Sequence, residues 1–305
     1  MSAPDPLRDP ETGAYSAALF EDAAARELLR ARRHGRCLSV ASFQAPAGLA
    51  RPLLAALARA VRDEDLLSTA GPGRFRVLLP ETDAFGALAF LRRAEREADL
   101  EPALGAQPGG TVDLGAATFP ADGAGLEALL GRCEARLAAS RGSPARDLPP
   151  AAEGFWAALD RLAAAGAFRS ARVAADDLER EVARGLARDP AGRALIYAGG
   201  GAAGRFQPLL AALPAAGGRA GDQGPRLFLL GPRAADGAEP RHPLATRVYL
   251  DADRRLARER FLLVLAGRAA YALWERGGEP LHLSDARAVS ALATRLAAQY
   301  ELAPA

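Results

Sequence analysis

The chain has 305 residues, which is enough for two domains of ordinary size, each with its own core. Half of the residues are apolar and a quarter are charged, a composition that excludes extended disorder. The formal net charge of +2 gives no basic excess typical of a nucleic-acid binder, and the absence of lysine excludes a P-loop or a Schiff-base enzyme.

Cysteine and histidine supply no recognisable site. Cys37 and Cys133 are far apart and have neither metal-ligand nor disulfide spacing, so we expect reduced, buried thiols. The histidines are isolated from one another in sequence. No apolar run reaches the length of a membrane span, and residues 1–9 lack the character of a signal peptide. These features predict a cytoplasmic protein.

The first half alternates helix and strand patterns in chain order. Apolar residues at helical spacing predict helices over residues 19–33, 52–62, 83–98 and 126–140. Buried apolar runs predict strands over residues 38–43, 75–79 and 112–119, with a two-strand hairpin at residues 71–73. This order predicts an α/β sheet covered by helices.

A stretch rich in proline and polar residues interrupts the pattern after residue 143. We therefore predict a first domain over 1–143, a linker over 144–153 and a second α/β domain over 154–305. In the second domain we expect helices over 155–165, 172–187 and 285–299, and strands over 194–198, 227–230, 247–250, 261–266, 271–275 and 281–283.

The predicted hairpin carries the most specific motif of the chain, the residues Gly71, Pro72, Gly73, Arg74 and Phe75. It resembles the signature hairpin of the GGDEF family, the diguanylate cyclases that make cyclic di-GMP. Segments 9–15, 32–39, 78–83 and 112–123 are also similar to family motifs and follow the family order. The resemblance covers roughly residues 9–142 and implies a nucleotide-cyclase-like sheet and a role in bacterial signal transduction.

The acidic residues of the family's metal site are absent from this sequence. Gly73 and Arg74 stand where the signature has Asp and Glu, and Gln44 stands where a strand of the family ends in an Asp that binds Mg²⁺. Mg²⁺ prefers carboxylate and phosphate oxygens, which an amide and a guanidinium do not supply. The resemblance therefore implies a degenerate domain without catalysis, for which no Mg²⁺ cofactor is expected. Arg141 aligns with a phosphate-binding lysine of the family.

One functional motif of the family is retained. Arg62 and Asp65 form an R-x-x-D sequence with five residues between Asp65 and Gly71, which is the position of the family's inhibitory site for cyclic di-GMP. A guanidinium can bind phosphate or guanine, and a carboxylate can accept hydrogen bonds from guanine. The structural alternative is that Arg62 ends a helix and Asp65 caps a turn.

The second half resembles a different family more diffusely. The strand over 194–198 with Phe206 and Gln207 after it, the apolar strand over 261–266 and the segment 271–275 are similar to the DICT sensory domain. A competing motif, the G-x-G-x-x-G of residues 199–204, would indicate a dinucleotide site. Pro208 and the lack of a ribose-binding acid favour a glycine-rich turn instead.

We therefore predict a catalytically inactive GGDEF-type signalling protein with a sensory domain, in which cyclic di-GMP binds at Arg62 and Asp65. The first alternative is a nucleotide-free scaffold that pairs with a sensor kinase, a response regulator or an active cyclase. The second is a residual diguanylate cyclase. Nucleic acid and membrane are not expected as partners, and a homodimer remains open.

Overall fold

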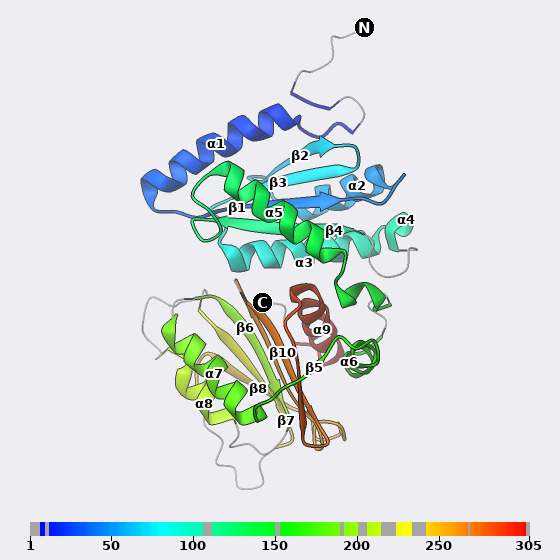
Figure 1. Cartoon of the computed structure of the whole chain (residues 1–305), viewed down its shortest axis with the longest axis vertical. Helices are drawn as coiled ribbons and strands as arrows, with labels where there is room; N and C mark the ends of the chain where they lie inside the picture. The colour runs from blue at the N-terminus through cyan, green and yellow to red at the C-terminus, as the bar shows by residue number, and fades with distance from the viewer. Residues whose placement is uncertain are drawn as a thin grey trace. The chain divides into compact units, whose positions relative to one another are not determined.

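The chain divides into two compact units, unit 1 (Met1–Glu153) and unit 2 (Gly154–Ala305) (Figure 1). The computed structural model describes residues 7–9, 12–105, 112–149, 153–189, 192–200, 206–214, 224–233, 242–267 and 269–302. The boundary between the units falls at the end of the stretch that the sequence predicts as a linker. The beginning of that stretch is a short 3₁₀ helix, η1 (Pro144–Asp147), which belongs to unit 1.

The described residues of unit 1 form a four-stranded antiparallel sheet with the order β2-β3-β1-β4. Its strands are β1 (Leu38–Gln44), β2 (Leu66–Gly71), β3 (Arg74–Pro80) and β4 (Asp113–Phe119). Its helices are α1 (Ala17–His34), α2 (Ala50–Ala60), α3 (Ala84–Leu100), α4 (Pro102–Gly105) and α5 (Leu126–Ser140). The α/β class and the hairpin expected for this half are confirmed.

Successive side chains of β1 point to opposite faces of the sheet, and helices cover both faces. Leu38 and Val40 point into a core formed with α1 and α5, whereas Ala41 and Phe43 point into a core formed with α2 and α3. The ring of Phe43 meets that of Phe90 on α3 edge to face, with centroids 6.0 Å apart. Because both faces are covered, every residue of β1 before Gln44 is buried, including Ser39 and Ser42.

The edge strand β4 is protected by side chains instead of a neighbouring strand. These contacts are Leu114 N to Ser140 Oγ (3.0 Å), Arg136 Nη1 to Ala116 O (2.6 Å) and Thr118 N to Asp122 Oδ2 (2.9 Å). Helix α5 lies directly on β4 at Gly115, where an added Cβ would be 2.6 Å from Cys133 O and from Leu137 N. The glycine therefore sets how closely α5 approaches the sheet.

The described residues of unit 2 form a seven-stranded mixed sheet with the order β5-β11-β10-β9-β6-β7-β8. Strands β6, β7 and β8 are parallel, and the other neighbours are antiparallel. The strands are β5 (Arg169–Ser170), β6 (Ala194–Gly199), β7 (Arg226–Gly231), β8 (Ala245–Tyr249), β9 (Arg260–Ala266), β10 (Ala270–Arg276) and β11 (Glu279–Leu283). The helices are α6 (Phe155–Ala164), α7 (Ala175–Arg188), α8 (Gln207–Ala212) and α9 (Ala286–Gln299).

Helices α7 and α8 cover one face of this sheet, and α6 and α9 cover the other (Figure 1). Leu262 and Val264 of β9 point toward α7 and α8. Phe261 points the opposite way and packs against Phe155 and Trp156 of α6, with ring centroids 4.9 and 5.7 Å apart. No helix in the described part of the chain is long and apolar enough to span a bilayer.

Two elements of unit 2 differ from the sequence prediction. Helix α8 forms although Pro208 lies in its first turn, because a proline there removes no intrahelical hydrogen bond. Pro208 therefore does not by itself count against a helix after the glycine-rich segment. Strand β5 has two residues, too few for a periodic pattern, and exists because it pairs with β11.

The glycines that end β6 allow close packing between strands. An added Cβ on Gly200, which has φ +86°, would lie 2.0 Å from Glu259 O, and one on Gly199 would lie 2.4 Å from the ring of Phe261. These two glycines are therefore needed for the contact with the beginning of β9. The remaining glycines of the G-x-G-x-x-G motif, Gly201 and Gly204, lie outside the described residues.

Candidate functional site

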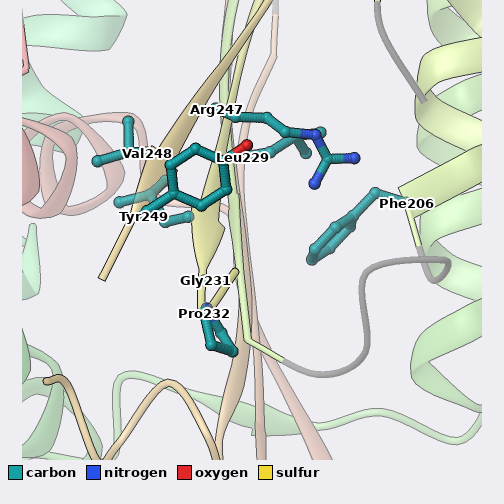
Figure 2. A pocket seen from close by; sticks show the side chains of 8 residues that line it. Phe206, Leu229, Gly231, Pro232, Arg247, Val248 and Tyr249 are labelled. Carbon is teal, nitrogen blue, oxygen red and sulfur yellow. The ribbon is translucent and has the colours of Figure 1, made fainter. Parts of the chain in front are cut away.

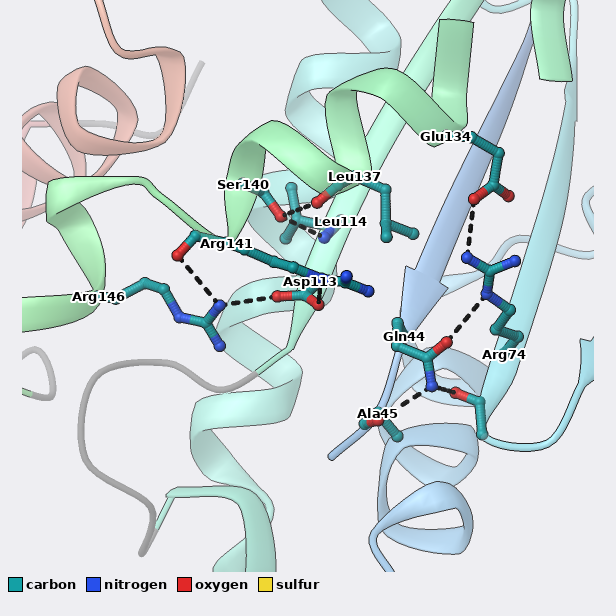
Figure 3. A network of polar contacts seen from close by, with 11 residues as sticks. Gln44, Ala45, Arg74, Asp113, Leu114, Glu134, Leu137, Ser140, Arg141 and Arg146 are labelled. Atoms are coloured by element: carbon teal, nitrogen blue, oxygen red, sulfur yellow. Dashed lines mark hydrogen bonds and ion pairs between the residues drawn. The ribbon is translucent and has the colours of Figure 1, made fainter. Parts of the chain in front are cut away.

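The register of unit 1 brings three polar side chains to one end of the sheet. Gln44 at the end of β1 lies opposite Arg74 on β3 and opposite Asp113 on β4 (Figure 3). The turn before Arg74 consists of Pro72 and Gly73, and Gly73 has φ +66°, a conformation that favours glycine. Residues 71–75 therefore form a tight hairpin that positions Arg74 beside Gln44.

The guanidinium of Arg74 contacts the side-chain amide of Gln44 and the carboxylate of Glu134. Its Nε donates to Gln44 Oε1 at 2.9 Å, and its Nη2 lies 2.9 Å from Glu134 Oε2 on α5. Gln44 Nε2 in turn donates to the carbonyls of Ala45 (3.1 Å) and Gly73 (3.3 Å). The side chains of Arg74 and Glu134 are 37% and 33% exposed, so solvent reaches this pair.

Asp113 is the second carboxylate at this end of the sheet. The sequence analysis includes it only as part of the motif over residues 112–123. Its side chain is 10% exposed and accepts from Arg141 Nε at 2.7 Å and from Arg146 Nη1 at 2.8 Å. Figure 3 shows the side chain of Arg141 extending past Asp113 toward Gln44. The basic residue that aligns with the family's phosphate-binding lysine is therefore engaged with a carboxylate of its own unit.

The donors at this site do not fit the Mg²⁺ that the resemblance implies for an active cyclase. Glu134 and Asp113 are each paired with arginine, and Gln44 supplies one amide oxygen that already accepts from Arg74. Within the part of the chain that the structure describes, no three His, Cys, Asp or Glu side chains converge as a metal site. A hard cation would need these carboxylates released from their guanidinium partners.

Arg62 and Asp65 lie together in the turn that follows α2. Asp65 Oδ2 accepts from the backbone N–H of Arg62 at 2.8 Å, and Asp65 N donates to Arg62 O at 3.1 Å. Burial raises the pKa of the Asp65 carboxyl, and the hydrogen bond from Arg62 offsets this only in part. The side chain of Arg62 is 61% exposed, and its Nη1 lies 3.8 Å from Glu64 Oε1.

A third residue of this turn, Arg93 on α3, was missed by the sequence analysis. Its Nε donates to Ala60 O at 2.7 Å at the carboxyl end of α2. Burial and the neighbouring charge of Arg62 lower the pKa of Arg93, and Arg96 contributes in the same direction. In the sequence, Arg93 is an arginine on a predicted amphipathic helix. Arginines are typical of any solvated helix face, so this pattern did not identify it as a site residue. Arg62, Arg93 and Asp65 form what we call the turn cluster.

The turn cluster contains two guanidinium groups and one carboxylate, and the charge of Arg62 contributes to the lowered pKa of Arg93. Its guanidinium groups repel one another, and an anion placed between them would remove that repulsion.

No protein-family model and no curated protein matches the chain. Among solved structures it is similar to GGDEF domains. The GGDEF domain of TpbB (YfiN) from Pseudomonas aeruginosa has 20% identity and a TM-score of 0.39 over 45% of this chain and 90% of that chain. The GGDEF domain of DgcB from Caulobacter crescentus, in complex with c-di-GMP, has 17% identity and a TM-score of 0.41 over 47% and 94%.

A third similar structure is the diguanylate cyclase SiaD from Pseudomonas aeruginosa in complex with its activator SiaC. It has 21% identity and a TM-score of 0.41, over 46% of this chain and 60% of that chain. The similar structures are thus GGDEF domains that cover somewhat less than half of this chain.

Proposed function

We propose that this chain is a GGDEF-type signalling protein without diguanylate cyclase activity. The observation that supports the proposal is Arg74, whose guanidinium lies between Gln44 and Glu134 at the strand ends. Phosphoryl transfer between nucleotides depends on metal ions that neutralise the phosphates and align the reacting oxygens. A positive side chain paired with the nearest carboxylate leaves no place for such an ion.

The proposed working mode is binding of cyclic di-GMP at the turn cluster. Arg62 and Arg93 present guanidinium groups suited to the two phosphates or to the acceptor edge of guanine. Asp65 presents a carboxylate suited to the N–H donors of guanine. The ligand class comes from the sequence resemblance, and the repulsion between the arginines supports an anionic occupant.

Titration of the whole chain with cyclic di-GMP tests this mode. We expect saturable binding that weakens about tenfold or more in Arg62→Ala, because one charged fork of the site is lost. Arg51→Ala is the matched control, since Arg51 is an exposed arginine in the first turn of α2, the helix that precedes the turn with Arg62. Equal affinity of the two variants would contradict the proposal.

A nucleotide-free scaffold is the second candidate, and one observation favours it. The carboxylate of Asp65 is already used to fix the turn through the N–H of Arg62. If cyclic di-GMP does not bind at millimolar concentration, the turn cluster is structural and the scaffold reading holds. Incubation with GTP and Mg²⁺ tests the residual cyclase separately, and steady formation of cyclic di-GMP would refute the inactive assignment.

We also propose that unit 2 is a sensory module that resembles the DICT domain. It has its own mixed sheet and its own core, which supports a separate role. Its ligand or partner would change signalling only by its differential affinity for two states of the chain. The partner expected from the resemblance is a signalling protein such as a sensor kinase, a response regulator or an active cyclase.

A further inference from the structure

The hollow at the carboxyl ends of β7 and β8 in unit 2 is too small for an organic ligand. Leu229, Val248 and Tyr249 are among the residues that surround it (Figure 2). It has room for about one water molecule. The outer face of α1 in unit 1 gives a clearer indication of a partner.

Helix α1, the long blue helix on one face of the unit 1 sheet in Figure 1, exposes a leucine on its outer face. The side chain of Leu29 is 64% exposed. In the described part of the chain, the other large apolar side chain that a helix exposes in this way is Leu100, the last residue of α3. Ala18 and Ala25 are also exposed and lie on the same side of α1 as Leu29. The outer face of α1 therefore has a narrow apolar stripe.

The charged residues beside this stripe are separated by sign along the helix. Glu21 and Asp22 lie toward the beginning of α1, and Arg32 and Arg33 lie in its last turn. All four are exposed. Within the described residues, the side chains of Glu21 and Arg33 have no hydrogen-bond or ionic partner. An acid and an arginine at opposite ends of the stripe are therefore available to another molecule.

The other two charged residues have contacts that leave room for a further partner. Asp22 pairs with Arg26, whose Nη2 lies 3.0 Å from Asp22 Oδ2, and both side chains are more than half exposed. Arg32 donates from Nη2 to the carbonyl of Ala124. A guanidinium has several N–H donors and a carboxylate has several acceptor positions, so neither contact saturates its group.

An antiparallel second copy of α1 matches this distribution of charge. Because a helix turns by about 100° per residue, each side of the stripe has one acidic and one basic residue. The pairs are Asp22 with Arg33 on one side and Glu21 with Arg32 on the other. A two-fold axis perpendicular to the helix places each side against the same side of the second copy, so that every acid faces an arginine.

The positions along the helix agree with a single axis. The midpoints of the two charge pairs, and the midpoint of Ala25 and Leu29, coincide to within one residue. The large side chain of Leu29 then faces the small side chain of Ala25 in the other copy. A parallel arrangement would instead place each charge beside the identical charge of the second copy, which is repulsive.

We propose that two copies of this chain associate through the outer faces of antiparallel α1 helices. Leu29 of each copy packs over Ala25 of the other, which removes the exposed stripe from water. One helix pair buries less than the roughly 1,600 Å² of a standard interface, so the expected dissociation constant is about 10–100 μM. The turn cluster lies on the α2 and α3 side of the sheet, so the proposed dimer leaves it open to a ligand.

Sedimentation velocity of the full chain at about 1 to about 500 μM protein tests the proposal. We expect a monomer–dimer equilibrium over this range. The dimer should weaken when NaCl is raised from about 0.05 M to about 0.5 M, because salt screens exposed ion pairs. This measurement uses the unchanged chain and does not depend on how a variant folds.

Leu29→Glu tests the apolar contact. It should weaken the dimer about tenfold or more, because a charge would be placed against Ala25 of the second copy. Leu100→Glu is the matched control, since Leu100 is an equally exposed leucine on another helix of unit 1, and it should leave the dimer unchanged. Circular dichroism checks that both variants keep their helices.

An exchange of charges tests the antiparallel orientation. Arg33→Glu should weaken the dimer about fivefold or more, because two symmetry-related pairs become repulsive. Adding Asp22→Arg to this variant should restore the affinity to within about twofold of the unchanged chain, because both pairs form again with the signs reversed.

Four outcomes would overturn the proposal. The first two are a chain that stays monomeric over the whole concentration range and a dimer that salt does not weaken. The third is a dimer that persists unchanged in the folded Leu29→Glu protein. The fourth is a charge-exchanged double variant that is as weak as Arg33→Glu alone.

Discussion

Arg74 and Asp113 take part in ion pairs at the same end of the unit 1 sheet, but with different burial. The side chains of Arg74 and Glu134 are each about one third exposed. The carboxylate of Asp113, in contrast, is nearly buried and forms ion pairs with two arginines. Exposed pairs contribute little to stability because solvent screens them and the side chains lose freedom. The pair of Arg74 with Glu134 is therefore expected to contribute little to the stability of unit 1.

This difference gives a prediction for unfolding. Arg74→Ala should change the free energy of unfolding by less than about 1 kcal/mol, because its pair is solvent-exposed. Asp113→Asn should cost about 1–3 kcal/mol, because two charge-assisted hydrogen bonds to a nearly buried group are weakened. Urea denaturation of the two variants checks this, and a larger loss for Arg74→Ala would contradict it.

Cys133 predicts a stability change at alkaline pH. Burial raises the pKa of its thiol from 9.0 to about 12, and its Sγ donates to Val40 O at 3.0 Å. As pH rises above 9.0 the unfolded chain loses the thiol proton while the folded chain keeps it. The contribution of the buried thiol to the free energy of unfolding is present at neutral pH. It is lost between pH 9.0 and about 12, at about 1 kcal/mol per pH unit.

Urea denaturation at about pH 8 and about pH 10 measures this loss. Cys133→Ala is the comparison, because it removes the thiol and leaves every other titrating group in place. The variant should lose less stability than the unchanged protein over this interval. Equal losses would show that the Cys133 thiol does not carry the effect.

At the scale of elements, the packing of α5 on β4 determines how the strand-end site is assembled. Helix α5 carries Glu134, and Arg141 is its C-cap residue, so its distance from β4 decides whether these side chains reach Arg74 and Asp113. Gly115 allows the close approach, and the side chains of Arg136 and Ser140 bond to the free edge of β4. The same helix thus protects an edge and supplies the site.

Two glycines of this region give a matched test. Gly115→Ala should destabilise unit 1 by about 1–3 kcal/mol, because its Cβ would meet backbone atoms of α5 that cannot move separately. Gly131→Ala should stabilise by up to about 1 kcal/mol, because Gly131 is an exposed helical position with nothing near an added Cβ. Thermal or urea unfolding checks both signs, and a stabilising Gly115→Ala would refute the close-contact explanation.

At the scale of the whole molecule, the chain consists of two units with separate sheets and separate cores. We expect fragments 1–153 and 154–305 to fold when they are expressed separately, because each keeps its own buried apolar surface. Each should show cooperative unfolding, and its NMR spectrum should overlay on the matching part of the full chain. A fragment that is unfolded alone would show that the unit depends on the other one.

Much of the fold follows from local patterns in the sequence. Alternation in β1, the helical spacing of α1 and α5, and the cap residues Ser16 and Asp83 are all readable from neighbouring positions. The departure from the GGDEF pattern that the resemblance implies at Gln44 and Arg74 is likewise a matter of residue identity, and so is the R-x-x-D spacing of Arg62 and Asp65. These features depend on interactions within a few residues or on a comparison of motifs.

Only the tertiary structure decided which distant groups meet. It paired Arg74 with Glu134, gave Asp113 two arginine partners, and brought Arg93 to the turn at Arg62. Each of these results depends on strand register and helix packing between residues far apart in the chain, and a local pattern carries no information about such distances.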